Sequence, residues 1–443
     1  MDEYKTSESN TEETNKSLEE NIVQELEQIA EYIRDAYSKE EFGNVAEQIH
    51  IFADLIHDIL NNIQPKAQTI QKIKDILINT ELASLIGENI CNKNKGVLFD
   101  CVHLLYSVSF NNDLLLIFAE YDILAELCKF FLTWPRSKWL EIIVVITSLI
   151  KFQTSIDDLI SHFPDIQAKL SMYPGGIMLY VQLSNQLLMH FPDPNLILPI
   201  VDGFCTIVDD LPFPETYDCI SRMIHIEENV CELIIERNIL QRIVDLCTIQ
   251  RMKSEDVSSP MRIIAKIALH CESNVISQYG FLYSVAEALI NSDVENKIIS
   301  GIKFIISMLP DNFNTLITFV TEDNLLGLIA SFMSTGSLKL KKNSAKLMCK
   351  LIKSTNESII SLSIVYNIPK LMIPILENDL ADVYEILTFY LITFQYVDND
   401  IAKKDEMINM LNEVEGIDAF HDCYESDNDN IHYLAEEVLK YVE

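Results

Sequence analysis

Residues 295–309, ENKIISGIKFIISML, decide the fold because their apolar side chains recur at the period of an α-helix. The apolar stripe consists of Ile298, Ile299, Ile302, Ile305, Ile306 and Leu309. The same pattern recurs in residues 260–270, PMRIIAKIALH, and in residues 343–353, NSAKLMCKLIK. Each copy is followed by a polar turn and two shorter apolar segments. The sequence therefore predicts a unit of helices that repeats along the chain.

A single unit of this kind cannot bury its apolar stripe, so neighbouring units must stack. With only 11 glycines and 13 prolines in 443 residues, the composition suits stacked helices with short turns. We predict an all-α fold, an armadillo-repeat right-handed superhelical solenoid of about ten repeats over residues 21–443. Residues 1–20 are rich in acids and carry almost nothing apolar, which predicts a disordered acidic tail.

The net charge of the chain is −34, which disfavours binding to phosphate backbones and to anionic lipid surfaces. We therefore expect neither nucleic acid nor a membrane as partner. The longest apolar run, residues 142–150, is roughly half of the ~20 residues that a membrane span needs. The start of the sequence holds no apolar segment of signal-peptide length. These features predict a soluble intracellular protein.

The concave groove of such a solenoid is its natural binding surface. On each long helix, two positions four residues apart lie beside the apolar stripe and point the same way. We call each such pair a rung. The predicted rungs are His103 and Ser107, Val144 and Ser148, Val181 and Asn185, Asp218 and Arg222, Arg262 and Lys266, Lys303 and Ser307, and Lys346 and Lys350. Successive rungs lie 41, 37, 37, 44, 41 and 43 residues apart, near the armadillo period of roughly 40 to 47.

Four segments carry a resemblance to a known family. They are SSPMRIIAKIALHCESN (258–274), SLKLKKNSAKLMCKLIKSTNES (337–358), EVEGIDAFHDCYESDNDNIHYLAEEVLKYVE (413–443) and HFPDPN (190–195). From about residue 25 to the end, the chain resembles the importin α family of nuclear-import adaptors. The resemblance implies an adaptor of the cytoplasm and nucleus that holds a localisation signal of a protein cargo in its groove, without a cofactor. It also implies that the last repeat contacts an export receptor.

Two departures from the family bear on function. The family reads basic peptides with Trp and Asn at the paired positions, and here only Asn185 keeps the Asn. The Trp positions hold His103, Val144, Val181, Asp218, Lys303 and Lys346, whereas Arg262 stands where the family also places Arg. The two tryptophans, Trp134 and Trp139, lie outside the rungs. The family's basic N-terminal segment is replaced by Lys5 and Lys16 among acids, so we do not expect importin β to be bound in that manner.

The rungs leave alternatives open. Five cations on three adjacent rungs, Arg262, Lys266, Lys303, Lys346 and Lys350, are either solvated helix faces or a half-groove that prefers an acidic or mixed-charge segment. Ser148 and Asn185 either hold the backbone of an extended peptide or are plain surface residues. Asp218 and Arg222 either bind a ligand charge or, more simply, pair with each other.

The sequence carries no catalytic motif: no Gly-rich phosphate loop, no HExxH, no GxSxG and no Cys/His cluster with metal-ligand spacing. His50 and His57 share a helical face with Asp54 and Asp58, a group that we interpret as structural or solvated. The ten cysteines are scattered and predict reduced, mostly buried thiols. We predict no enzyme, no metal and no cofactor. The predicted function is an importin α-like adaptor; the alternative is an armadillo scaffold that no longer binds localisation signals.

Overall fold

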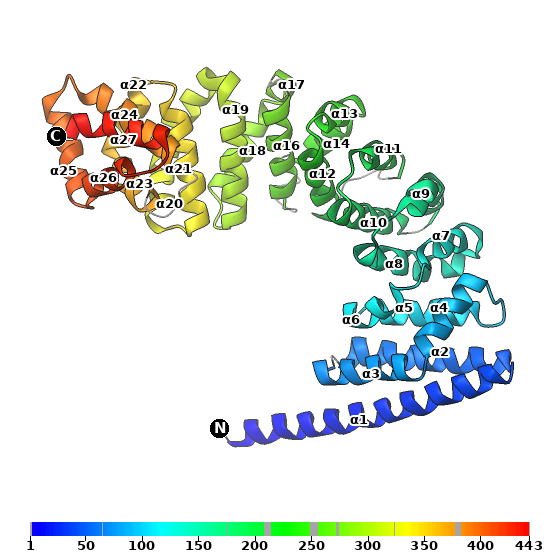
Figure 1. Ribbon diagram of the computed structural model, residues 1–443. Helices are drawn as coiled ribbons and strands as arrows, with labels where there is room; N and C mark the ends of the chain where they lie inside the picture. Colours follow the sequence, from blue (N-terminus) through cyan, green and yellow to red (C-terminus); the bar gives the residue numbers. More distant parts are fainter. Residues whose placement is uncertain are drawn as a thin grey trace. The chain divides into compact units, whose positions relative to one another are not determined.

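The computed structural model describes residues 2–63, 65–173, 175–207, 214–248, 256–271, 274–322, 324–376 and 382–442. All regular elements within these ranges are helices (Figure 1). The chain divides into two compact units, an N-terminal unit, Met1–Ile226, and a C-terminal unit, Glu227–Glu443. Each unit is a stack of helical repeats with its own apolar core.

The N-terminal unit contains α-helices, short 3₁₀ turns and one π-helical turn. Its elements are α1 (Asp2–Ser38), α2 (Phe42–Asp58), η1 (Ile59–Ile63), α3 (Ala67–Asn79), α4 (Leu82–Asn92), α5 (Leu98–Val108), α6 (Asn112–Leu115), η2 (Leu116–Phe118), α7 (Leu124–Thr133), η3 (Arg136–Lys138), α8 (Trp139–Leu149), η4 (Ile150–Phe152), α9 (Asp157–Leu170), α10 (Gly176–His190), η5 (Pro194–Leu196), α11 (Ile197–Ile207) and α12 (Pro214–Ile226).

Helices α2, α5, α8, α10 and α12 form a ladder in which each packs on the next. A full repeat holds two further helices, as α3 and α4 precede α5. Before α10 and α12, the described residues hold one helix of more than one turn each, α9 and α11 respectively. The two rung spacings of 37 residues fall in these two repeats.

The C-terminal unit repeats the same plan. Its elements are α13 (Val230–Glu236), α14 (Ile239–Leu246), α16 (Ser258–His270), α17 (Asn274–Ser277), α18 (Phe281–Ile290), α19 (Glu295–Glu322), α20 (Leu325–Thr335), α21 (Leu338–Ile352), α22 (Glu357–Val365), α23 (Ile368–Leu376), α24 (Val383–Val397), α25 (Ile401–Asn412), α26 (Gly416–Tyr424) and α27 (Asp429–Val442). The ladder consists of α16, α19, α21, α24 and α27, each packed on the next (Figure 1).

The apolar stripe of residues 295–309 supplies the core of its repeat, as predicted. Ile302 and Ile305 have no exposed surface, and Ile298, Ile299 and Leu309 are each less than 7% exposed. Burying one such side chain contributes about 1.5–3 kcal/mol. The stacking of these stripes confirms the all-helical, armadillo-type solenoid.

The corner between the two short helices of a repeat has a recurring backbone conformation. A non-glycine residue with positive φ stands there in four repeats: Glu81, Asn238, Asn367 and Glu415. Asn324 has the same conformation between the long helix α19 and α20. Asn is enriched in this left-handed region because its short polar side chain tolerates it. The recurrence shows that the repeats share a local geometry even where their sequences differ.

The structure differs from the prediction at two boundaries. Helix α19 continues to Glu322, where we predicted a break after Leu309. Helix α1 begins at Asp2, where we predicted a disordered tail through residue 20. Glu19 is already buried and accepts a hydrogen bond from the Thr69 hydroxyl. The Glu-rich composition favours continuation of a helix that is packed at its C-terminal half.

Among the described residues, no single helix is long and apolar enough to cross a membrane. Of the described helices, only α22 and α23 taken together pass that test. They are bent by 79°, and Ile359, Ile364 and Ile368 on them are buried.

Candidate functional site

Helices α16, α19 and α21 concentrate positive charge in an acidic protein. Residues 258–270, 295–309 and 338–352 hold one acidic residue, Glu295. Their Lys and Arg residues are Arg262, Lys266, Lys297, Lys303, Lys339, Lys341, Lys342, Lys346 and Lys350. The whole chain has 67 acids against 33 bases. These three stretches therefore have the opposite balance of charge.

Lys303 lies at the centre of the concentration. Partial burial lowers the pKa of its ammonium group, and the charges of Arg262, Lys339, Lys266 and Lys346 lower the pKa further. The four cations come from α16 and α21, which pack on either side of α19. The stacking therefore brings cations that are up to 84 positions apart in the sequence within electrostatic reach of one another. We call Arg262, Lys266, Lys303, Lys339, Lys346 and Lys350 the basic face.

Most of the basic face is open to solvent. The side chains of Arg262, Lys303, Lys339, Lys346 and Lys350 are exposed, and that of Lys266 is half-buried. The Arg262 guanidinium donates to Ser259 Oγ at 2.8 Å.

The basic face is bordered by α24, whose first turn carries acidic side chains. Lys346 Nζ lies 3.3 Å from Asp382 Oδ1 at the start of α24. Lys353, one turn beyond the face, pairs with Glu385.

Three of the predicted rung positions are buried. Ser107 and Val181 have no exposed surface, and Ser307 is 2% exposed. The Ser307 hydroxyl donates to the Phe304 carbonyl at 2.7 Å. Positions four residues apart differ by about 40° around a helix. In each of these three pairs, the difference turns one member toward the neighbouring helix. A partner cannot reach these side chains, so these three predictions are wrong.

The other rung positions of the N-terminal unit are partly accessible. Val144 and Ser148 lie half-buried on α8, and Asp218 and Arg222 are exposed on α12. The ion pair that we expected between Asp218 and Arg222 is not formed within this described helix. Asn185 Nδ2 donates to the Glu215 carbonyl at 2.8 Å, which ties α10 to the start of α12.

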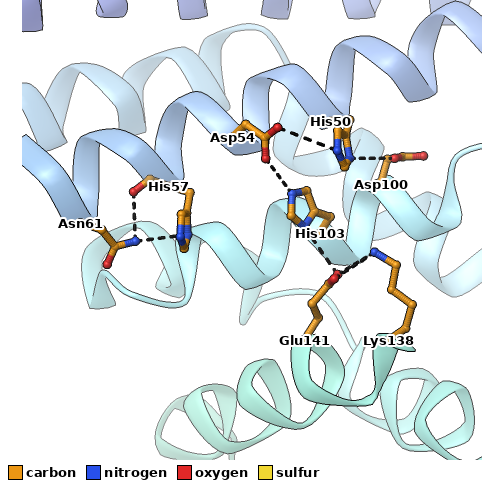
Figure 2. A network of polar contacts seen from close by, with 8 residues as sticks. All are labelled: His50, Asp54, His57, Asn61, Asp100, His103, Lys138 and Glu141. Carbon is orange, nitrogen blue, oxygen red and sulfur yellow. Dashed lines mark hydrogen bonds and ion pairs between the residues drawn. The ribbon is translucent and has the colours of Figure 1, made fainter. Parts of the chain in front are cut away.

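His103 belongs to a polar network that joins α2, α5 and α8 (Figure 2). Its Nε2 lies 3.0 Å from Asp54 Oδ1, and its Nδ1 lies 3.5 Å from Glu141 Oε2. The contact with Glu141, followed by the hydrogen bond with Asp54, raises the pKa of the imidazole above its usual value against the opposing effect of burial. Burial raises the pKa of Glu141, but the contacts with His103 and Lys138 together outweigh it, so that the pKa lies below its usual value.

His50 completes the network from α2. Its Nδ1 lies 3.3 Å from Asp100 Oδ1, and its Nε2 lies 3.8 Å from Asp54 Oδ2. The His50 and His103 rings stack with centroids 4.6 Å apart. Lys138 Nζ reaches Glu141 Oε1 at 2.9 Å and closes the network on α8 (Figure 2).

Several members of both groups were not predicted from the sequence. Lys339 shares a face with Lys346 and Lys350, and a count of lysines at spacings of seven and four would have found it. Asp100 and Glu141 come from helices other than α2. Their approach to His50 and His103 follows from helix stacking, for which the sequence holds no local signal.

The tryptophans and cysteines take structural positions. Trp139 Nε1 donates to the Trp134 carbonyl at 3.0 Å, and Trp134 stacks on Phe130. All ten cysteines are free thiols, and six of them are buried.

No family model matches the chain, and no curated protein matches it. Among solved structures, the chain is similar to an engineered protein, with 12% identity over 94% of this chain and 98% of that one and a TM-score of 0.66. It also matches a designed armadillo repeat protein with 16% identity over 56% of this chain and 99% of that one, at a TM-score of 0.40. A structure concerning a phosphorylation switch in the interaction between cadherin and beta-catenin matches with 13% identity over 90% of this chain and 67% of that one, at a TM-score of 0.39. The first likeness supports the fold alone. The chain's own stacked repeats of up to three helices define it as an armadillo-type solenoid.

Proposed function

We propose that this chain is a protein-binding scaffold whose C-terminal unit holds an acidic, extended segment of a partner protein along the basic face. The observation that carries the proposal is the position of Lys303 among four other cations from two neighbouring helices. Like charges held together on a surface destabilise the free protein slightly, and an acidic ligand removes that repulsion.

The acidity of the whole chain does not oppose such a ligand at physiological salt. The Debye length there is about 8 Å, so acids elsewhere on the surface are largely screened from a ligand on the face. The charges that act on the ligand are those of α16, α19 and α21, together with Asp382 and Glu385 at the edge of the face. In residues 258–270, 295–309 and 338–352 the one acid is Glu295.

The spacing of the ladder suits an extended chain. Packed helices lie about 8–10 Å apart, so α16 and α21 are separated by roughly 20 Å. An extended peptide advances about 3.3 Å per residue, so about six residues cross the three helices. We expect Asp, Glu or phosphorylated side chains at about every third position of the bound segment.

Fluorescence polarisation with a labelled Asp/Glu-rich peptide tests the proposal. The test variant is Lys303→Glu with Lys350→Glu, which reverses two charges of the face and leaves the Lys346–Asp382 pair intact. The control is Lys297→Glu with Lys341→Glu, the same reversal on the same two helices at positions a third of a turn or more away.

We expect the wild type and the control variant to bind the acidic peptide, with affinity that falls as salt rises. The test variant should bind at least about tenfold more weakly, which corresponds to about 1.4 kcal/mol. Equal affinity of the test and control variants, or no binding by the wild type, contradicts the proposal.

A second candidate is the importin α-like adaptor of the cytoplasm and nucleus, for which the order of the four family-like segments is one support. A second support is the acidic character of the ladder in the N-terminal unit, where Asp54, Asp100 and Glu141 lie on three successive ladder helices. Such a surface attracts a Lys/Arg-rich segment.

Under the adaptor proposal, a labelled basic localisation-type peptide binds with steep salt dependence, and Lys303→Glu with Lys350→Glu leaves this binding unchanged. The export-receptor contact of residues 413–443 is then tested by pull-down. A basic peptide that fails to bind at low salt eliminates this candidate and leaves the scaffold.

A further inference from the structure

We propose that His50, Asp54 and His103 form a binding site for a divalent transition-metal ion of the zinc type. One ligand atom from each residue lies within 4.8 Å of the others. The three residues come from two adjacent ladder helices, α2 and α5, and Figure 2 shows both imidazole rings turned toward the Asp54 carboxylate.

The donor set fits zinc-type chemistry. Two imidazole nitrogens and one carboxylate oxygen are ligands that Zn²⁺ accepts at about 2.0–2.2 Å. Mg²⁺ and Ca²⁺ prefer oxygen ligands alone, so two histidines discriminate against them. Three protein ligands leave at least one coordination position for water or for a donor group of a bound partner.

Outer-shell carboxylates orient both histidines. Nδ1 of His50 faces Asp100 Oδ1 at 3.3 Å, and Nδ1 of His103 faces Glu141 Oε2 at 3.5 Å. A carboxylate on one ring nitrogen holds the proton there and leaves the other nitrogen as the ligand. In both rings that other nitrogen is Nε2, which lies 3.8 Å and 3.0 Å from Asp54 oxygens respectively.

The geometry needs little adjustment to accept an ion. Tetrahedral ligands at 2.0–2.2 Å from a metal lie about 3.3–3.6 Å apart, so the widest gap in the cluster must close by roughly 1.2–1.5 Å. His50 and Asp54 are exposed, so their side chains have room to move, whereas His103 is half-buried and anchors the site. An ion can therefore bind through side-chain movement alone.

His57, two turns along α2 from His50, provides an internal comparison. Its Nδ1 lies 3.2 Å from Asn61 Nδ2, and its ring packs beside Tyr106 and Phe110. An amide and aromatic rings do not supply the carboxylate that orients a metal-binding histidine. His57→Gln is thus a matched control on the same helix.

Titration of the full-length, chelator-treated chain with Co²⁺ tests the proposal, with visible absorption as the readout. Exposed thiols are alkylated first, because Cys91 is exposed and thiolates also bind cobalt. We expect one Co²⁺ per chain in the wild type and in His57→Gln, displaced by Zn²⁺. In His50→Gln and in His103→Gln, binding should weaken by at least the roughly 10- to 100-fold that loss of an outer-shell partner costs.

The variant Asp100→Asn distinguishes a metal site from a network that consists of ion pairs alone. Asp100 is a positioning residue, so its variant should keep the stoichiometry of one and bind about 10- to 100-fold more weakly. Absence of Co²⁺ binding in the wild type, or equal affinity in His50→Gln and His57→Gln, overturns the proposal. Circular dichroism of His50→Gln checks that the fold is retained, as expected for an exposed side chain.

Discussion

Lys303 links the stability of the C-terminal unit to the proposed binding surface. Its pKa lies below the ordinary lysine value of 10.5, chiefly because of burial and then because of the cations around it. The folded protein therefore binds this proton less tightly than the unfolded chain. The charged lysine therefore lowers the stability of the folded protein at neutral pH. This loss of stability disappears as the pH rises through the pKa of Lys303 in the folded protein toward 10.5.

We predict that Lys303→Met stabilises the protein at pH 7 and weakens its binding of the acidic peptide. The gain should be less than about 1 kcal/mol, because charges in partly solvated positions are screened. Urea unfolding of wild type and variant at pH 7 and above pH 10.5 measures it, and the difference should shrink at the higher pH. A variant that is less stable than the wild type at pH 7 would show that burial and the neighbouring cations do not make the Lys303 charge destabilising.

The position of Lys346 and Lys350 on one exposed face of α21 could be predicted from the sequence, because both residues lie on the same helix at a spacing of four. Whether they bind a partner stays a prediction. The errors at Ser107, Val181 and Ser307 arise because a 40° difference around the helix decides between solvent and the next helix, and the sequence does not fix that rotation. The His50, Asp54 and His103 cluster was not predicted as a metal site, because residues 50 and 103 meet only through stacking.

At the scale of elements, the ladder depends on close approach of helices within each repeat. Gly301 on α19 faces α18, where a Cβ would lie 2.7 Å from the Ala286 carbonyl oxygen and 2.8 Å from Ile290 Cγ1. A contact that short with a backbone atom forces the two helices apart.

Gly301→Ala is therefore expected to destabilise the protein by about 1–3 kcal/mol, the usual cost of overpacking. Gly280→Ala, where a Cβ would have no atom within 4 Å, should change stability by less than about 0.5 kcal/mol. Urea denaturation of both variants provides the comparison. Equal stability of the two would mean that α18 and α19 adjust freely and that their packing does not limit the repeat.

Element boundaries were predicted less well than element types. The break expected after Leu309 is absent, because helix α19 runs on to Glu322. Apolar periodicity indicates that a segment is helical, whereas the end of a helix depends on capping and on what the next element packs against. The corner residues with positive φ, such as Asn367, would have been a better guide to boundaries than the apolar runs.

At the scale of the whole molecule, the excess of 67 acids over 33 bases makes self-repulsion a general property of the folded chain. The solenoid itself was predictable, because repetition of one pattern needs no knowledge of long-range contacts. The concentration of cations on three adjacent rungs was also visible in the sequence, whereas the effect of Lys339 on Lys303 depends on the packing of α21 on α19, which the structure supplies.

We predict that the thermal midpoint rises when sodium chloride is increased from about 0.02 M to about 0.5 M, because screening shortens the Debye length from about 20 Å to about 4 Å and weakens repulsion between distant acids. Differential scanning fluorimetry measures this shift. A midpoint that falls with added salt would show that the ion pairs at the surface outweigh the net charge of −34.

The most direct test of the acidic-segment proposal is zero-length carbodiimide cross-linking of the acidic peptide to the full chain, followed by mass spectrometry. Carboxylates of the bound peptide should form amide links to the lysines of the basic face, Lys266, Lys303, Lys339 and Lys350, and unlabelled peptide should suppress these links in competition. Links spread over lysines on other faces, such as Lys72 and Lys341, or none on α16, α19 and α21, would contradict a binding site on the basic face.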